Sequence, residues 1–298
     1  MSPLTPHHSP TMIETKSEIL HQERVAPQIF LLRLRSPQIA REARPGQFVH
    51  LRIREGTDPL LRRPFSIHRA DRERGEVQVL YQVVGRGTKM LSRKPVGEML
   101  DCLGPLGHGY EVPDERGEAV IVAGGIGIAP LIFLVEDHFR GGEVTALIGA
   151  RSSEGILYDD LLRSWGARVH LATDDGSLGH RGPVTDLLRQ QTTKYTKYTK
   201  RTVHLSARFE GRGGKETSRF LPFVVYACGP DAMLRKVAKL CHPYEIPCQV
   251  SLENRMGCGL GACLGCVVKA RSSAPPGHEY KRVCKEGPVF EAGEVIFE

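Results

Sequence analysis

Four cysteines near the end of the sequence have the residue type and the spacing needed to hold iron. Cys258, Cys263 and Cys266 stand in GCGLGACLGC with four and then two residues between them, and Cys284 follows after a further 17 residues. This C-x4-C-x2-C…C spacing is typical of a plant-type [2Fe-2S] cluster, in which four thiolates bind two irons. The glycines between the cysteines let a short loop fold closely around such a cluster. The spacing therefore predicts a [2Fe-2S] centre on these four cysteines.

A structural zinc site is the main alternative for the same residues. Such sites usually carry paired C-x2-C spacings, and only Cys263 and Cys266 have that spacing here. Disulfides are disfavoured by 8 Cys in 298 residues without a secretory segment. The other cysteines are expected to be small buried residues, as most free cysteines are. They are Cys102, Cys228, Cys241 and Cys248.

Composition places the chain among globular proteins of two or three domains. It has 298 residues, of which 40% are hydrophobic and 25% charged. No apolar run is long enough to cross a bilayer, so no membrane association is expected. The start, MSPLTPHHSPTM, has no signal-peptide pattern, and Met12 is an alternative first residue. A cytoplasmic location is expected.

The net charge of +7 comes almost entirely from one segment. Residues 190–220 hold eight Lys and Arg against Glu210 and Glu216, and the rest of the chain is nearly neutral. Nucleic-acid binding is therefore not expected. Within this segment, 191–220 contains the repeat TKYTKYTK and has no apolar face, so it is predicted to be a disordered insertion.

Residues 17–104 consist of short runs with alternating apolar residues, separated by turn formers. This pattern is typical of an antiparallel barrel or sandwich. One helix is expected from Thr88 to Lys94, with Thr88 as its N-cap. The predicted strands include FLLRLRS, QFVHLRI, PFSIHRA and EVQVLYQVV.

Two motifs in this region have the chemistry of a flavin site. Arg63, Pro64, Phe65 and Ser66 open a strand, where an arginine can hold a pyrophosphate and a nearby serine can reach a flavin edge. The second motif, Gly85-Arg86-Gly87-Thr88, opens the predicted helix, whose N–H groups favour an anion. A solvated strand end and a plain turn are the alternatives. Together the two motifs favour a flavin.

Residues 116–248 alternate apolar strands with helices, which predicts a parallel, doubly wound sheet. The turn with Gly124, Gly125 and Gly127 follows the first strand, and Pro130 lies in the first turn of the next helix. This context favours a dinucleotide phosphate loop, although the turn lacks the full G-x-G-x-x-G pattern.

Other candidate ligand-binding residues follow the predicted strands, because ligands bind at the carboxyl ends of strands in such sheets. Asp174 and Asp175 would repel a 2′-phosphate, so NAD is expected rather than NADP, while Arg151 could attract that phosphate. A plain turn is the alternative for the two aspartates. The residues at strand ends are Arg151, Asp174, Asp175, Gly176, Cys228, Gly229 and Pro230.

The motifs and their order resemble the ferredoxin–NADP reductase superfamily and, more closely, the electron transfer subunits of dihydroorotate dehydrogenase B. The resemblance covers nearly all of 15–298. The motifs that carry it are RPFSI at 63–67, GRGTKML at 85–91, AGGIGIAPL at 123–131, TDDGSLGHRG at 173–182, ACGP at 227–230, SLENRMGCGLGACLGC at 251–266 and YKRVCKEGPVF at 280–290.

The resemblance implies how FAD is held and how electrons travel. It implies that Arg63 and Ser66 serve the FAD pyrophosphate and flavin, and that Gly87 and Thr88 hold phosphates. It also implies a relay from the FMN of a partner dihydroorotate dehydrogenase subunit, through [2Fe-2S] and FAD, to NAD+. The complex is expected to be a heterotetramer. Residues offering backbone along the flavin would be Leu80, Tyr81 and Gln82.

The expected fold is multidomain α/β. It comprises an antiparallel FAD-binding barrel (13–115), a parallel-sheet NAD-binding domain (116–248) and a small [2Fe-2S] domain (249–298). Two other functions remain open at this point. One is a reductase subunit of a sulfhydrogenase or of a ferredoxin:NADP oxidoreductase. The other is a non-catalytic zinc-stabilised binding module.

Overall fold

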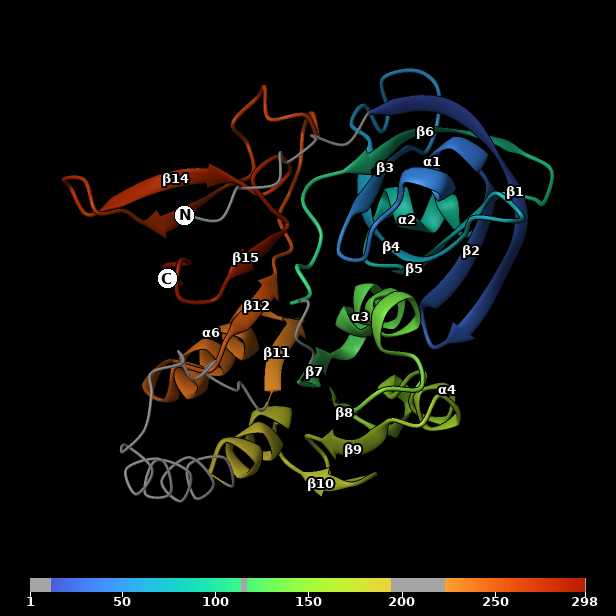
Figure 1. Ribbon diagram of the computed structural model, residues 1–298. Coiled ribbons are helices and arrows are strands. Elements are labelled where there is room, and N and C mark those ends of the chain that lie inside the picture. Colours follow the sequence, from blue (N-terminus) through green and yellow to red (C-terminus); the bar gives the residue numbers. More distant parts are fainter. Residues whose placement is uncertain (1–11, 114–116, 194–222, 298) are drawn as a thin grey trace, which may run out of the picture.

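The computed structural model describes residues 12–113, 117–193 and 223–297. They form a closed barrel, a seven-stranded sheet, and a C-terminal segment with its own two-stranded ribbon (Figure 1). The predicted insertion at 191–220 lies almost wholly outside the described residues. In the part of the chain that is described, no helix has the length and apolarity to cross a membrane. The predicted multidomain α/β fold is confirmed.

The barrel is antiparallel throughout, in the order β1-β2-β5-β4-β3-β6. Its interior is filled by fully buried aliphatic side chains such as Leu32, Val49 and Ile67, because alternate residues of each strand point inward. Phe133 from the neighbouring domain joins this core. The strands are β1 (Ile13–Ala26), β2 (Ile29–Arg35), β3 (Phe48–Arg52), β4 (Arg63–Asp71), β5 (Glu76–Gln82) and β6 (Met99–Leu106).

Two short helices, α1 (Pro37–Glu42) and α2 (Arg86–Leu91), complete the barrel domain. Helix α2 begins two residues before the predicted start, with Gly85 as its N-cap. Thr88 is therefore not the N-cap, and that prediction is wrong. Its hydroxyl reaches back from the first turn, accepts hydrogen bonds from the N–H groups of Val84 (3.0 Å) and Gly85 (3.2 Å), and donates to the Gly85 carbonyl. Thr88 therefore lies within the first turn of α2, and its side chain caps the backbone groups just before the helix.

The seven-stranded sheet has the order β10-β9-β8-β7-β11-β12-β15 and is parallel except for its last strand. Alternate residues of β7 belong to two different cores, since Val120 and Val122 face one layer of helices and Ile121 faces the other. The strands are β7 (Glu118–Gly124), β8 (Val144–Ala150), β9 (Arg168–Thr173), β10 (His180–Arg181), β11 (Phe223–Cys228), β12 (Cys248–Ser251) and β15 (Val289–Glu291).

Helices cover both faces of this sheet, as a doubly wound fold requires. Helices α3 (Ile128–Leu134) and α4 (Asp159–Ser164) pack on one face. Helix α6 (Asp231–Cys241) and a helical run at 184–193 pack on the other. The single-turn helices are η1 (Gly125–Gly127), η2 (Val135–Phe139, a π turn), η3 (Ser153–Gly155) and η4 (His242–Tyr244).

The C-terminal segment is built onto the sheet rather than standing apart from it. After β12 it forms the cysteine loop and the ribbon of β13 (Val267–Arg271) and β14 (His278–Arg282), and then returns as β15, antiparallel to β12. Cys266 and Cys284 are buried in the same core as Val120 of the sheet. This packing gives the cysteine loop a rigid base.

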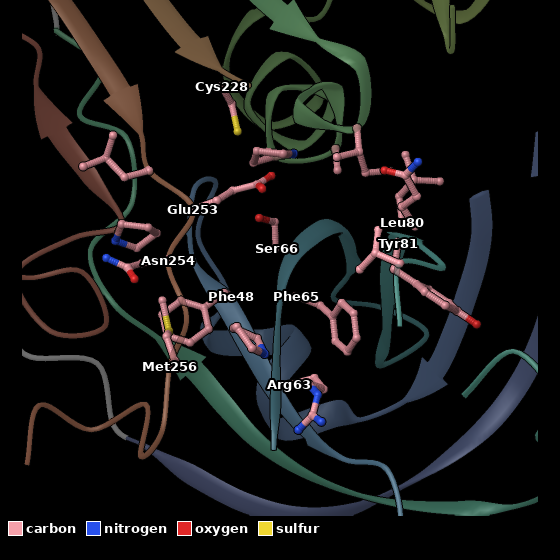
Figure 2. A pocket seen from close by; sticks show the side chains of 18 of the residues that line it. Phe48, Arg63, Phe65, Ser66, Leu80, Tyr81, Cys228, Glu253, Asn254 and Met256 are labelled. Carbon is pink, nitrogen blue, oxygen red and sulfur yellow. The ribbon is translucent and has the colours of Figure 1, made fainter. Parts of the chain in front are cut away.

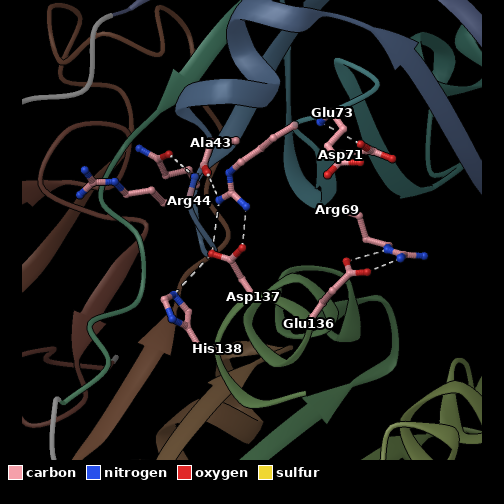
Figure 3. A network of polar contacts seen from close by, with 10 residues as sticks. Ala43, Arg44, Arg69, Asp71, Glu73, Glu136, Asp137 and His138 are labelled. Atoms are coloured by element: carbon pink, nitrogen blue, oxygen red, sulfur yellow. Dashed lines mark hydrogen bonds and ion pairs between the residues drawn. The ribbon is translucent and has the colours of Figure 1, made fainter. Parts of the chain in front are cut away.

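Ion pairs join the barrel to the sheet domain at the π turn η2. Arg69 of the barrel forms a two-bond pair with Glu136, and Arg72 pairs with Asp137 (Figure 3). Arg72 also donates to the Ala43 carbonyl at 3.1 Å. A π turn adds one residue to a helix and is frequent at functional positions. Here it presents two successive carboxylates to the barrel, which fixes the cleft between the domains.

Candidate functional site: a flavin pocket beside a cysteine loop

A pocket of about 300 Å³ lies between the barrel, the first turn of α3 and the segment after β12 (Figure 2). Its walls are mostly apolar, with a few polar groups directed inward, as is usual for cofactor sites. The lining residues are Phe48, Arg63, Pro64, Phe65, Ser66, Leu80, Tyr81, Gln82, Val84, Thr88, Ile126, Ala129, Pro130, Cys228, Leu252, Glu253, Asn254, Met256 and Pro288.

The structure brings together the two barrel motifs that predicted a flavin. Strands β4 and β5 are neighbours, so the segment from Arg63 to Ser66 lies beside the segment from Leu80 to Gln82. Thr88 also lines the pocket, and Gly87 lies against the Arg63 guanidinium. Every predicted FAD-binding residue is therefore in the pocket wall or in contact with it.

Arg63 is suited to hold a pyrophosphate at one end of this pocket. One guanidinium nitrogen, Nη1, is anchored by the carbonyl of Leu61. A Cβ at Gly87 would lie only 3.0 Å from Arg63 Nε, so the glycine leaves room for the guanidinium. The other N–H groups remain available for phosphate oxygens, which arginine can bind in pairs.

Tyr81 and its neighbours form a rigid aromatic wall. Its ring stacks on Phe30 and meets Phe65 edge to face, with centroids 5.7 and 5.5 Å apart. Its hydroxyl donates to Gln22 Oε1 at 3.1 Å, and Gln22 in turn donates to the Leu91 carbonyl at the end of α2. Tyr81 is fully buried and is tied to the helix that carries the second motif, so it supports Phe65, the partly exposed ring that lines the pocket and could face a flavin.

The two nucleotide motifs of the sheet domain meet directly behind the pocket. Gly127 packs so tightly that a Cβ there would lie 2.2 Å from the Cys228 carbonyl oxygen, and only glycine fits. Gly124 lies in the same way against Gly229 and Pro230. Pro130 and Cys228 reach the pocket itself. Of the predicted set, Gly124, Gly125, Gly127, Gly229 and Pro230 are absent from its lining.

Ser66, Cys228 and Glu253 come from three different elements and point toward one another in the pocket (Figure 2). Burial raises the pKa of the Glu253 carboxyl, and nearby Asp231 adds to the shift. Burial also raises the pKa of the Cys228 thiol, with Glu253 adding to it, so Cys228 stays a neutral thiol. Glu253 is solvent-exposed, so a carboxyl with a raised pKa lies at the open side of the pocket beside the Ser66 hydroxyl.

Glu253 is the main residue that the sequence reasoning missed. It follows β12 by two residues, so the strand-end rule that selected Cys228 would also have selected it. The other lining residues lacked such a signal, because they are apolar or amide side chains without a chemical motif. They are Phe48, Val84, Ile126, Ala129, Leu252, Asn254, Met256 and Pro288.

The cysteine loop begins two residues after the pocket-lining Met256. The backbone N–H of Cys263 points at the Cys258 sulfur (3.4 Å), and the N–H of Cys284 points at the Cys266 sulfur (3.4 Å). The N–H of Gly261 also points at the Cys284 sulfur, at 3.1 Å. The four predicted ligands therefore stand as two neighbouring pairs.

Two pairs of sulfurs, three from one loop and the fourth from Cys284 after β14, fit a two-iron cluster, which takes two thiolates on each iron. In the described residues, no three His, Cys, Asp or Glu side chains are arranged as a ligand set for a single ion. Burial acts to raise the pKa of Cys258, but the N–H groups of Leu260 and Cys263 outweigh it and lower that pKa to about 6. N–H groups that favour the thiolate also favour metal ligation.

The polar residues at the ends of β8 and β9 lie away from the pocket. Asp175 accepts hydrogen bonds from the N–H and hydroxyl of Ser177, which lower the pKa of its carboxyl. Arg151, Asp174 and Gly176 flank this exposed turn. None of these four residues lines the pocket.

Family models match both ends of this site. The model described as "Oxidoreductase FAD-binding domain" matches residues 14–110, and "Iron-sulfur cluster binding domain of dihydroorotate dehydrogenase B" matches 253–296. The second match begins at Glu253 and contains all four cysteines.

Curated relatives match over almost the whole chain. The chain is 39% identical over 283 residues to "Dihydroorotate dehydrogenase B (NAD(+)), electron transfer subunit" of Desulforamulus reducens, covering 95% of this chain and 98% of the relative. It is 38% identical over 281 residues to the protein of the same name in Bacillus cereus, with coverage of 93% and 96%.

Solved structures show the same architecture. The NADH-dependent reduced ferredoxin-NADP oxidoreductase matches with a TM-score of 0.74 and 28% identity, over 95% of this chain and 90% of that one. A ferredoxin NADP+ reductase from Neisseria gonorrhoeae with bound FAD and NADP shares the fold at a TM-score of 0.59 and 17% identity, over 77% and 91% of the two chains. The chain belongs to the family of dihydroorotate dehydrogenase B electron transfer subunits.

Proposed function

We propose that this chain is an oxidoreductase subunit that relays electrons from a dihydroorotate-oxidising partner to NAD+, in pyrimidine (UMP) biosynthesis. One observation carries the proposal. Four residues after β12 line the flavin pocket, and the chain continues directly from them into the loop that begins at Cys258; they are Leu252, Glu253, Asn254 and Met256. The short segment after β12 therefore connects the flavin site to the proposed one-electron centre.

The chain's residues would hold three cofactors in series. Cys258, Cys263, Cys266 and Cys284 would bind the [2Fe-2S] cluster, and the pocket would bind FAD. When bound, the flavin converts single electrons into a hydride for the nicotinamide. Arg63 would bind the pyrophosphate, Phe65 backed by Tyr81 would orient the ring, and the loop with Gly127 together with Cys228 would receive NAD+.

Ser66 and Glu253 would accept and donate the proton that accompanies hydride exchange. The hydroxyl lies in the pocket wall, and the Glu253 carboxyl faces it from the solvent-exposed segment after β12. Because burial raises the pKa of Glu253, this group can hold a proton at higher pH than an exposed glutamate. The buried side chains of Phe48 and Leu252 form apolar parts of the same pocket wall.

The partner is proposed to be an FMN-containing catalytic subunit, assembled with this chain as a heterotetramer. The surface around the cysteine loop supports a docking role, since four large apolar side chains are exposed there. They are Leu260, Leu264, Val267 and Tyr280, with exposed fractions of 43%, 61%, 36% and 65%. The proposed compartment is the cytoplasm, which fits eight cysteines that form no disulfide.

The reading as a subunit of another reductase has less support. The relatives at 38–39% identity carry the dihydroorotate dehydrogenase name, whereas the ferredoxin-NADP oxidoreductase structure stands at 28%. NAD remains the proposed nucleotide. Asp174 and Asp175 lie at the strand end where a 2′-phosphate would approach, next to Arg151.

Cofactor analysis of the purified chain tests the proposal. We expect FAD, two irons and two acid-labile sulfides per chain, and NADH oxidation with an artificial electron acceptor. A chain that carries zinc and no flavin would refute the relay. A chain that reduces the acceptor equally well with NADPH would refute the NAD preference alone.

A further inference from the structure

His50 is a fully buried histidine that none of the roles above uses. It lies on β3, two residues after Phe48, whose ring lines the pocket. The two rings are in edge contact, with centroids 6.5 Å apart. On the neighbouring strand β4, the residue paired with His50 is Pro64, next to Arg63. One side of His50 is therefore the wall of the flavin pocket.

The other side of His50 is the cysteine loop. A Cβ at Gly259 would lie 2.5 Å from His50 Nδ1, so the ring touches the loop backbone. Gly259 has φ of +74°, which places the backbone here in a conformation that favours glycine. The backbone of the preceding residue, Cys258, is also close enough to influence the imidazole. His50 is thus a single side chain between the pocket wall and a cluster ligand.

A buried histidine that served only for packing at this position would cost folding free energy. Neither ring nitrogen makes a hydrogen bond of normal geometry among the described residues, although backbone groups of Cys258 and Arg62 lie near the ring. Burial lowers the pKa of His50 to about 4, with Arg62 acting in the same direction, so the ring is neutral. An unpaired buried polar group costs free energy that a leucine would not. The ring nitrogens of His50 therefore need a hydrogen-bond partner to offset this cost.

We propose that His50 is a positioning residue for electron transfer, whose ring fixes the Cys258–Gly259 segment against the flavin pocket and whose Nδ1 hydrogen-bonds the loop backbone. Nδ1 is the nitrogen that faces the loop. A hydrogen bond beside a cluster ligand changes the potential of the metal centre, and a fixed spacing sets how readily an electron crosses. This inference rests on the proposed relay.

The test compares His50→Asn and His50→Leu in the full chain loaded with FAD and cluster. Asparagine places an amide near the Nδ1 position, whereas leucine keeps volume and loses both nitrogens. Three quantities are measured: the cluster midpoint potential by EPR-monitored redox titration, the rate at which the reduced-cluster EPR signal appears after rapid mixing with NADH, and hydrogen exchange of 257–261 in cluster-free protein.

We expect His50→Leu to shift the midpoint potential, to delay the cluster signal by at least about tenfold, and to speed hydrogen exchange in the loop. His50→Asn should restore the potential and most of the rate. Flavin bleaching by NADH should be the same in both variants, because the residues proposed to receive NAD+, Gly127 and Cys228, belong to the sheet domain and His50 to the barrel.

A pair of glycine variants tests the same contact without touching His50. Gly259→Ala pushes a methyl group toward Nδ1, whereas Gly277→Ala introduces similar strain (φ of +86°) in the turn between β13 and β14, where nothing lies within 4 Å of the added group. We expect Gly259→Ala to delay the cluster signal more than Gly277→Ala does. This pair also decides the question if His50→Leu does not fold.

Two outcomes would overturn the inference. One refutes only the role of His50, and the other also refutes the relay. If wild type holds both cofactors and bleaches with NADH, but the His50 and Gly259 variants match it in potential and rate, then His50 has no positioning role and the relay stands. If wild type itself holds no cluster or no FAD, then both the relay and the role of His50 are wrong.

Discussion

The guanidinium of Arg282 donates a hydrogen bond to the carbonyl of Gly261 at 2.9 Å. Arg282 lies two residues before Cys284, and Gly261 lies between Cys258 and Cys263. The same guanidinium pairs with Glu286, which lowers the pKa of that carboxyl. Arg282 therefore ties the segment of the fourth cysteine to the loop of the first three.

Replacing Arg282 should loosen the cluster. Arg282→Ala removes a charge-assisted hydrogen bond worth about 1.5–3 kcal/mol, so iron should be lost to a chelator about tenfold faster than from wild type. Arg271→Ala is the matched control, because Arg271 lies on the same ribbon and donates to the Gly293 carbonyl, away from the cysteines. Equal rates of iron loss from both variants would show that Arg282 does not hold the loop.

Removing one cysteine from each pair should abolish the cluster. The double variant Cys263→Ala/Cys284→Ala leaves one sulfur in each pair, so neither iron keeps two protein ligands. We expect no S = ½ EPR signal after dithionite reduction. Cys102→Ala, which changes a buried barrel cysteine, should keep the signal. Full iron and sulfide in the double variant would refute the ligand assignment.

Arg63→Ala should weaken FAD retention. The lost pyrophosphate contact is worth about 1.5–3 kcal/mol, which corresponds to a Kd at least about tenfold higher. Flavin fluorescence released on gel filtration measures the loss. Arg35→Ala serves as control, because Arg35 is an exposed barrel arginine paired with Glu18. An unchanged FAD affinity in Arg63→Ala would remove Arg63 from the site.

Glu253 should make the stability of the protein depend on pH. Its folded-state pKa lies above the ordinary value of 4.5, so the folded protein binds this proton more tightly than the unfolded chain. The free energy of unfolding should therefore fall as pH rises from about 4.5 through the raised pKa. Glu253→Gln should remove this fall, and chemical denaturation at a series of pH values measures it.

The control for Glu253 is Glu55→Gln, since the Glu55 side chain is 88% exposed. Its stability curve should follow that of wild type. If Glu253→Gln also follows wild type across the acidic range, the carboxyl does not keep its proton, and its proposed role in the pocket is wrong.

The sequence predicted most of this architecture because strong local signals agree with the fold. Alternating apolar residues specify the barrel, and the glycine turn at Gly124–Gly127 specifies the first strand–helix unit. The cysteine spacing indicated a two-iron site, since the spacing itself reflects how a loop wraps a cluster. The residues chosen for FAD all proved to be in or beside one pocket.

Features that depend on long-range packing were not predictable. Strand β15 is only Val289–Glu291, too short for a periodic signal, and it pairs with β12 only because the ribbon turns the chain back. The start of α2 was misplaced because the Thr88 hydroxyl caps the helix from its first turn. His50 looked like an ordinary strand residue, and only its contact with Gly259 distinguishes it.

The central claim is tested most directly by adding the purified FMN-containing dihydroorotate dehydrogenase subunit to this chain and following NAD+ reduction with dihydroorotate. The chain alone should oxidise NADH with a dye yet leave dihydroorotate untouched, and the mixture should reduce NAD+. Leu264→Glu should impair the mixture and spare the dye reaction, because Leu264 is 61% exposed on the cysteine loop. Turnover of dihydroorotate by the chain alone, or no binding of the FMN subunit, would contradict the account.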